Sequence, residues 1–405
     1  MSEIITRHCS LCNNVINESP QYIVENNMEV CWVCYENETV SCENCDTRIF
    51  TRNSVSCDTC GDYFCSHACR DSHDESNHNN REETSINDIQ RSYTFNPLLL
   101  ITKKAKTRSK TIQHLQPIGI ELECLSPNGS TLKELKNALP PYVGIVRDGS
   151  LSDSQLGVEI VTPPAKGNEL KILIKKVCKI LNEGGCSVDS TCGFHVHVGI
   201  NTIDEALGNM GRAWLFAFYL AFEPVLLGLV PRSRRNNKFC APNGNDFNLK
   251  DVMDCVKGTK NLAEVWYKKT SKVDIKREQE THYHESRYHG INLHSVFYNG
   301  NLEIRYHPGT LNEEKILAWI NLHGNVVEYV ESLIRVNAGT YQPLKDSILA
   351  ITSITDTKMR MDYMFDLINL SKKQRSYFKR RYSLFNKSLS LKIEEDNDDT
   401  IICAE

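Results

Sequence analysis

Ile118-Gly119-Ile120-Glu121-Leu122-Glu123-Cys124 alternates apolar and polar residues, as a β-strand does when its two faces meet different surroundings. Such a strand would point Ile120 and Leu122 into a core and place Glu121 and Glu123 together on the opposite face. Taken alone, this pattern is equally typical of a sheet with one solvated face. Its meaning depends on what the neighbouring strands carry.

Two later segments repeat the alternation: Gly193-Phe194-His195-Val196-His197-Val198-Gly199 and Asn301-Leu302-Glu303-Ile304-Arg305-Tyr306-His307. Their polar faces would carry His195, His197, Glu303 and Arg305, and the strand Gly157–Val161 adds Glu159. Clustered carboxylates repel one another unless cations neutralise them, so a facing array of glutamates favours metal binding. Oxygen ligands with an imidazole suit Mg²⁺ or Mn²⁺ better than Zn²⁺. An arginine beside them is suited to gripping a phosphate.

Longer segments between these strands have apolar residues at helical spacing, namely Leu170–Glu183, Ala206–Val230 and Glu313–Asn337, with more helix expected over 345–390. Strands and helices do not alternate regularly. We therefore expect an α+β fold with a largely antiparallel sheet and packed helices.

The apolar stretch Ala213–Val230 is long enough to raise the question of a membrane span. It contains Glu223-Pro224, and a charge beside a helix breaker is costly at membrane depth. We expect a buried core helix that bends or ends near Pro224, with no membrane segment.

The formal net charge of −4 is unevenly distributed over the 405 residues. Residues 1–100 hold 6 Lys/Arg against 16 Asp/Glu, residues 101–110 are +5 and residues 391–405 are −5. Ten of the 17 cysteines lie between Cys9 and Cys69, mostly in close pairs. Clustered thiolates on metal, with no signal-peptide pattern at the N-terminus, predict a cytoplasmic protein.

The cysteine pairs predict structural zinc. Ten cysteines and two histidines make twelve ligands, enough for three tetrahedral sites. The first set, Cys9, Cys12, Cys31 and Cys34, has the spacing of a four-thiolate knuckle or ribbon. The others are Cys42, Cys45, Cys57, Cys60, Cys65, Cys69, His73 and His78. A closed four-ligand site has no open position for a substrate, and the acidic head argues against nucleic acid, so the expected role is structural or protein-binding.

These features divide the chain into four parts: a zinc-binding module at 1–80, a polar then basic linker at 81–112, a catalytic domain at 113–390 and an acidic disordered tail at 391–405. Within the catalytic domain, the basic cluster containing Arg234 and Arg235 is a candidate phosphate or substrate site, with an exposed loop as the alternative.

The motifs GIELE, DGSL, GVEIVTPP, CGFHVHVG, RRNNKFCAP, RYHGINLH and LEIRYHPGTLNEEKILAWINL follow one another in the order seen in the amidoligase family, which this chain resembles from about Pro117 to Glu328. The resemblance implies a glutamine-synthetase-like fold and ATP- and Mg²⁺-dependent joining of a carboxylate to an amine through an acyl phosphate. It implies magnesium ligands at Glu121, Glu123, Glu159, His195 and Glu303. It further implies that His197 faces nucleotide or substrate, that Arg305 stabilises the phosphoryl group, and that substrate or nucleotide contacts come from Asp148, Ser150, Arg287 and Asn292.

Residues 42–78 partly resemble a MYND-type zinc finger. That resemblance implies one metal on Cys42, Cys45, Cys65 and Cys69, and another on Cys57, Cys60, His73 and His78. The last ligand departs from the family pattern, in which a cysteine stands where this chain has His78.

Two other functions compete with the ligase. One is an inactive ligase fold whose zinc fingers bind a protein partner. The other is a zinc hydrolase built on His195, His197 and a glutamate, which would act without ATP. For the ligase, the substrates are small-molecule or peptide carboxylates and amines, and the sequence does not name them.

Overall fold

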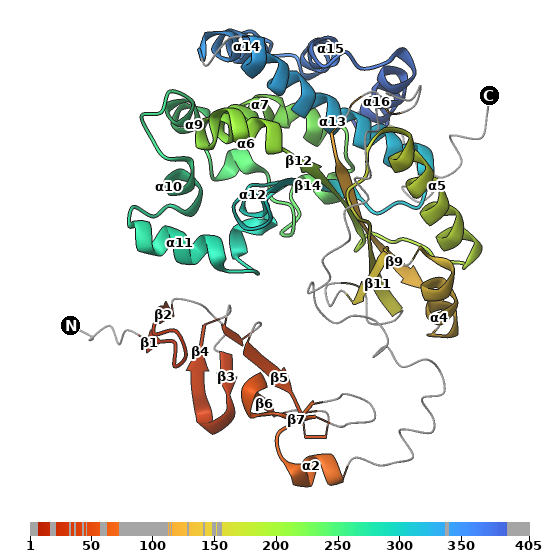
Figure 1. The fold of residues 1–405 in the computed structure, drawn as a ribbon, viewed down its shortest axis with the longest axis vertical. Helices are drawn as coiled ribbons and strands as arrows, with labels where there is room; N and C mark the ends of the chain where they lie inside the picture. The colour runs from red at the N-terminus through yellow and green to blue at the C-terminus, as the bar shows by residue number, and fades with distance from the viewer. Residues whose placement is uncertain are drawn as a thin grey trace. The chain divides into compact units, whose positions relative to one another are not determined.

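The chain divides into two compact units, Met1–Ile89 and Gln90–Glu405 (Figure 1). The computed structural model describes residues 7–16, 22–31, 34–35, 38–42, 44–45, 47–56, 63–72, 112, 114, 116–127, 129–140, 142–147, 151, 156–336 and 340–386. Residues 81–111 of the expected linker and the expected acidic tail lie outside these ranges. Each unit is described below by itself.

A six-stranded sheet organises the larger unit. Its strands are β9 (Ile118–Ser126), β10 (Gly144–Arg147), β11 (Leu156–Val161), β12 (Gly193–Gly199), β13 (Ile291–Asn292) and β14 (Asn301–Pro308). Every neighbouring pair is antiparallel, in the order β10-β11-β9-β12-β14-β13. The predicted α+β fold with an antiparallel sheet is confirmed.

The alternation in the strands separates an apolar face from a polar one. The apolar side chains expected to enter the core are at most 1% exposed: Ile120, Leu122, Phe194, Val196, Val198, Leu302 and Ile304. Helix α13 (Glu313–Val336) packs on β12 and also on α5 (Gly167–Glu183) and α7 (Asn209–Gly228). The hydrophobic core therefore lies between the sheet and these long helices.

Among the described residues of this unit, the other α-helices are α4 (Gly129–Ala138), α6 (Asn201–Leu207), α8 (Arg232–Arg235), α9 (Leu249–Val256), α10 (Leu262–Tyr267), α11 (Lys272–Glu280), α12 (His294–Asn299), α14 (Gln342–Ser353), α15 (Thr357–Leu367) and α16 (Lys372–Phe385). The helix expected over Ala206–Val230 is broken at Gly208, whose φ of 50° belongs to a backbone conformation that favours glycine. The helical structure expected over 345–390 is confirmed in the described part of that range, which contains α14, α15 and α16.

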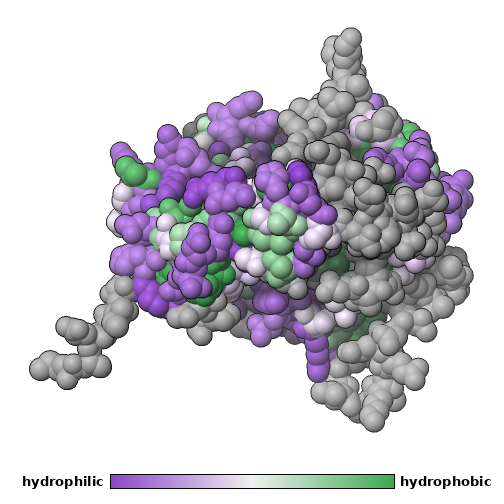
Figure 2. Space-filling view, turned by 90° about the horizontal axis from the view of Figure 1, so that it is seen from below, coloured by the Kyte–Doolittle hydropathy of each residue, from purple (hydrophilic) through white to green (hydrophobic). Residues whose placement is uncertain are grey.

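Helix α7 continues through Pro224 and ends at Gly228, four residues beyond the proline. The helix is therefore about one turn longer than an end at Pro224 would give. It is long and apolar enough to cross a membrane, but 72% of its apolar 18-residue stretch is buried inside the protein. Among the coloured residues of Figure 2, hydrophilic ones predominate and hydrophobic ones form small separate patches. The apolar composition of α7 is therefore explained by burial in the core.

The smaller unit contains short antiparallel hairpins. They pair β1 (Arg7–His8) with β2 (Val15–Ile16), β3 (Tyr22–Val24) with β4 (Met28–Val30), β5 (Thr39–Ser41) with β6 (Arg48–Phe50) and β7 (Val55–Ser56) with β8 (Tyr63–Phe64). Helix α2 (His67–Asp71) follows the last hairpin. A small apolar core surrounds Cys9, Cys31 and Cys34 and includes Val30 and Phe50. So small a core is typical of a module in which metal supplies part of the stability.

Candidate functional site: an acidic cluster on the polar face of the sheet

The strand register places the predicted residues on one face of the sheet. Glu121 lies opposite His195, Glu123 opposite Glu159, and His197 opposite Glu303. Directly opposed side chains in antiparallel strands are about 5 Å apart at Cβ, so this register brings four strands' functional groups into contact. A β-bulge between Phe194 and Val196 interrupts the pairing of β12 with β14 beside His195.

This polar face is buried. Glu159 is 1% exposed, His195 3%, Glu303 5% and Glu123 6%. A solvated sheet face would leave these side chains open to water. The alternative interpretation of the alternating strands, a sheet with one solvated face, is therefore wrong for these residues. Ionised groups are buried only when other charges or metals compensate them.

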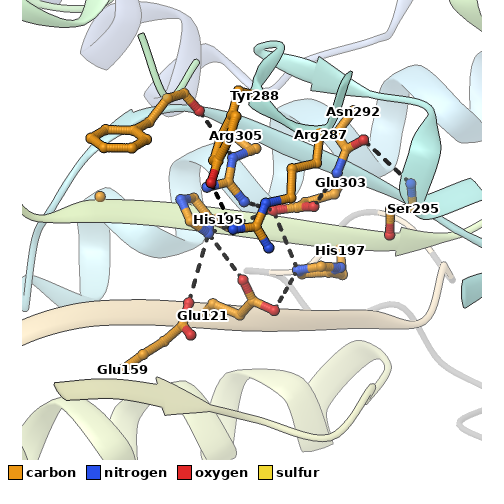
Figure 3. A network of polar contacts seen from close by, with 12 residues as sticks. Glu121, Glu159, His195, His197, Arg287, Tyr288, Asn292, Ser295, Glu303 and Arg305 are labelled. Atoms are coloured by element: carbon orange, nitrogen blue, oxygen red, sulfur yellow. Dashed lines mark hydrogen bonds and ion pairs between the residues drawn. The ribbon is translucent and has the colours of Figure 1, made fainter. Parts of the chain in front are cut away.

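His195 lies at the centre of the cluster (Figure 3). Its Nδ1 is 3.0 Å from Glu121 Oε2, 3.6 Å from Glu303 Oε1 and 3.8 Å from Glu159 Oε1. Its Nε2 lies 3.4 Å from Glu123 Oε1. The other oxygen of Glu123 accepts a hydrogen bond from the backbone N–H of Gly193.

His197 shares two of these carboxylates. Its Nε2 is 2.9 Å from Glu121 Oε1 and 4.0 Å from Glu303 Oε1. Its Nδ1 lies 2.9 Å from Asn301 Oδ1 on the other side of the ring. Glu121 therefore contacts both histidines.

Two overlapping groups of donor atoms are close enough to hold a metal ion: Glu121 with Glu159 and His195, and Glu121 with His197 and Glu303. The atoms in each group lie within 4.8 Å of one another. Two carboxylates and one imidazole, all at least half-buried, fit Mg²⁺ or Mn²⁺. Glu123 belongs to neither group, although its carboxylate borders His195.

The charges of the cluster alter its pKa values. Burial alone would raise the pKa of Glu121, but His197 and His195 outweigh burial and hold that pKa well below its usual range. Burial would likewise lower the pKa of His197, but Glu121 and Glu303 raise it to about 9. For Glu303, Arg305 and His197 outweigh burial and lower the pKa. The metal-free cluster is thus a set of mutually stabilised charges.

Arg305 borders the cluster through Glu303, to which its Nη1 donates, and its Nε donates to the carbonyl of Phe239 at 3.2 Å. Asn292 contacts the other side of Glu303, because its Nδ2 donates to Glu303 Oε2 at 2.6 Å. Both residues come from the predicted set, and the structure brings both to the same carboxylate.

Arg287 approaches the cluster from a segment outside the sheet. In Figure 3, Arg287 and Tyr288 point toward the side chains of the polar face. The guanidinium lies over the rings of Tyr283 and Tyr288, 4.7 and 4.8 Å from their centroids. Its Nη2 donates to the Tyr288 hydroxyl at 2.8 Å, whereas its Nε is buried without a hydrogen-bond partner among the described residues. A buried N–H of this kind suits an anionic ligand.

The other two candidate arginines make main-chain contacts. Arg234 is buried and donates to the carbonyls of Arg305 and Tyr306 at 2.8 and 3.4 Å. Arg235 donates to the carbonyls of Val230 and Phe385 at 3.0 and 3.1 Å. These contacts tie the segment after α7 to β14 and to α16. Asp148 and Ser150 lie outside the described residues.

A family model described as "Putative amidoligase enzyme" matches residues 103–327, more than half of the chain. The chain belongs to this amidoligase family. No curated protein shows a significant match to it. One solved structure, described as a novel glutamine synthase homolog, is 11% identical with a TM-score of 0.28 over 67% of this chain and 71% of that one. The whole acidic cluster lies inside the matched segment, and the cysteine-rich unit lies outside it.

The cysteine-rich unit of this amidoligase holds two groups of four sulfurs. One is formed by Cys9, Cys12, Cys31 and Cys34, and the other by Cys42, Cys45, Cys65 and Cys69. The sulfur atoms within each group lie within 4.8 Å of one another. The predicted ligands Cys57, Cys60, His73 and His78 lie outside the described residues.

The spacing within these groups can be compared with that of a zinc site. Tetrahedral zinc with Zn–S bonds of about 2.3 Å sets sulfur atoms roughly 3.8 Å apart. The Sγ separations are 3.7 Å for Cys12 and Cys31, 3.6 Å for Cys45 and Cys65, and 3.4 Å for Cys65 and Cys69. All eight thiols are free of disulfides, so both groups fit a four-thiolate metal site.

Sequence reasoning overlooked the residues behind the cluster. Asn301 contacts His197, and Ser295 contacts Asn301, its Oγ 3.0 Å from Asn301 Oδ1. Asn301 begins a predicted strand, so its place on the same face as Glu303 was available from the alternation. Ser295 gave no such signal, because α12 reaches the sheet only through the tertiary fold.

Proposed function

We propose that the chain is an ATP- and Mg²⁺-dependent ligase that joins a carboxylate to an amine through an acyl phosphate. Family membership supports the carboxylate–amine ligase class. The dependence on ATP and Mg²⁺ is supported by one observation, the buried cluster of Glu121, Glu159, His195 and Glu303 with Arg305 at its border. A buried, acidic, oxygen-rich donor set next to an arginine suits a nucleotide with its divalent cations.

The metal-holding residues in this proposal are the two donor groups that share Glu121. Bound divalent cations would offset the charges of the phosphates and of the developing leaving group. Mn²⁺ would fit the same donors, because carboxylates suit both ions.

The cationic side chains have distinct tasks. Arg305 would stabilise the phosphoryl group during its transfer to the substrate carboxylate, since its guanidinium already lies against the metal-facing carboxylate of Glu303. Arg287 would bind an anionic group of the nucleotide or substrate through its buried Nε. The amine then displaces phosphate from the acyl phosphate and forms the amide bond. No covalent enzyme intermediate is needed.

The two described cysteine groups are proposed to hold structural zinc, and the remaining ligand set is proposed to hold a third ion. Zinc in closed sites would stabilise a unit whose apolar core is small. A peptide or protein substrate captured by this unit remains our proposal for its role. Reduced thiols in metal sites also fit the cytoplasm, where we place the protein.

The direct test measures phosphate release from ATP with Mg²⁺ and pools of amino acids and peptides. We expect amine-dependent release that is lost in Glu121→Gln and Glu303→Gln. Glu280→Gln is the matched control, because Glu280 is exposed at the end of α11. A folded protein that neither binds ATP nor releases phosphate would favour the protein-binding alternative. Hydrolysis that requires tightly bound zinc and no ATP would favour the hydrolase.

A further inference from the structure

The two ring nitrogens of His197 face different surroundings. Nε2 faces the carboxylates of Glu121 and Glu303 at 2.9 and 4.0 Å. Nδ1 faces Asn301 Oδ1 at 2.9 Å. A neutral imidazole carries one proton and one lone pair, and only the nitrogen with the lone pair can bind a metal. The Glu121 carboxylate at Nε2 and the Asn301 amide oxygen at Nδ1 therefore compete for the one proton, and its position decides what His197 presents to the cluster.

Asn301 is itself held in place. Ser295 Oγ lies 3.0 Å from Asn301 Oδ1 and donates its hydrogen there. An amide oxygen accepts two hydrogen bonds, so the same oxygen takes the hydroxyl of Ser295 and the Nδ1–H of His197. Turning the amide round would set its NH₂ against Nδ1 and force the ring proton onto Nε2, facing Glu121.

Ser295 also fixes Glu303. Its backbone N–H donates to Asn292 Oδ1 at 3.3 Å, and Asn292 Nδ2 donates to Glu303 Oε2 at 2.6 Å. Because a backbone N–H can only donate, the orientation of the Asn292 amide is set. Ser295 and Asn292 are 3% and 2% exposed, so water does not compete for these bonds. Ser295 is thereby connected to His197 through Asn301 and to Glu303 through Asn292.

We propose that Asn301, held by Ser295, is a positioning residue that keeps the proton of His197 on Nδ1 and presents the Nε2 lone pair to a divalent cation between Glu121 and Glu303. This inference rests on the metal-dependent function proposed above. It gives His197 a metal-facing role, whereas the family resemblance implied a contact with nucleotide or substrate. Outer partners of ligating histidines fix the tautomer in this way in many metal sites.

The first test reads the tautomer without activity or metal. Long-range ¹H–¹⁵N spectra of histidine-labelled protein are recorded in chelator, at a pH high enough that the ring carries one proton. His197→Gln identifies the signals. We expect the proton on Nδ1 in the wild type and in Asn301→Asp, which keeps an oxygen acceptor. Asn301→Leu should lose that preference. A wild-type proton on Nε2, or an unchanged tautomer in Asn301→Leu, would overturn the proposal.

The second test measures Mn²⁺ affinity by the electron paramagnetic resonance signal of the free ion. We expect Asn301→Leu to weaken binding by about 10- to 100-fold. Asn301→Asp should retain it, and Asn299→Leu is the matched control because Asn299 is exposed. Equal affinity in Asn301→Leu and wild type overturns the inference.

A failure of the proposed function can be distinguished from a failure of this inference, and a second variant covers the case in which the first does not fold. Wild type that binds no Mn²⁺ would count against the proposed function and the metal-facing role together, while the tautomer spectra would still decide the position of the proton. If Asn301→Leu fails to fold by circular dichroism, Ser295→Ala carries the same test, because it removes the hydroxyl that holds Asn301 and keeps the backbone N–H.

Discussion

Glu121→Gln should strongly lower the pKa of His197 in the metal-free protein. The pKa of this histidine is raised from 6.5 to about 9, although burial pulls it down, and Glu121 is the largest of the raising contributions. The difference, 9 − 6.5 = 2.5, corresponds to roughly 3 kcal/mol between the two protonation states. Without the Glu121 charge, Glu303 at 4.0 Å is the remaining carboxylate near Nε2 among the described residues. We expect the pKa to fall to 6.5 or below.

The assay is an NMR titration of labelled His197 in chelator, with Glu280→Gln as the control. The sign of the stability effect follows from the direction of the change. A histidine whose pKa is raised in the folded state stabilises the fold fully below its unfolded pKa, and loses that stabilisation as pH rises through the folded value. The wild type should therefore lose stability between about pH 6.5 and 9, and Glu121→Gln should lack most of that loss. A pKa that stays above roughly 8 in the variant would refute the assignment of Glu121 as the dominant partner.

Three further changes test the structure around the site. Gly290→Ala would place a Cβ 1.9 Å from Tyr306 Cε1, so we expect a loss of about 3 kcal/mol, seen as a lower Tm. Gly300→Ala meets open space and should lose only the roughly 1 kcal/mol that a φ of +74° costs a residue with a Cβ. Equal losses would contradict the packing of Gly290 against Tyr306. Glu223→Leu would leave the backbone N–H groups of Asn243 and Gly244 without their acceptor, while the Tyr306 hydroxyl would keep Asn243 Oδ1 at 3.1 Å. We expect a loss of about 3 kcal/mol in urea unfolding, and a neutral result would show that the two N–H contacts do not form. Cys45→Ser should lower the zinc content by about one ion per chain in atomic emission, whereas Cys255→Ser, a core thiol outside both groups, should leave it unchanged.

The alternation of the strands was the most informative sequence feature, because a period of two fixes the side of each residue whatever the sheet order. It placed Leu122 in the core and Glu121 on the opposite face. The order of strands was not available, since the contact of β9 with β12 joins residues more than 70 positions apart. The burial of the polar face was likewise hidden, because residues of later segments such as Asn292 complete it.

Basic residues show the limit of reading charge from sequence. Arg234 and Arg235 follow an apolar helix and suggested an anion site, yet their donors serve main-chain carbonyls. Arg287 stood in a polar, histidine-rich loop and turned out to carry a buried nitrogen without a partner among the described residues. Composition gives the charge of a segment, but the availability of a donor depends on which carbonyls the fold brings to it.

The acidic cluster is difficult to explain as a stabilising feature. Glu121, Glu159 and Glu303 all approach one nitrogen of His195, and each pair of carboxylates repels. Apolar residues of similar volume on this face would avoid both the repulsion and the desolvation of buried charge. A chain that keeps such an array on four strands departs from the choices that stability alone would favour, and such departures concentrate at functional sites. If this array is a metal site, a divalent cation should raise the Tm, because the unfolded chain does not hold these donors together and the cation therefore binds the folded chain in preference.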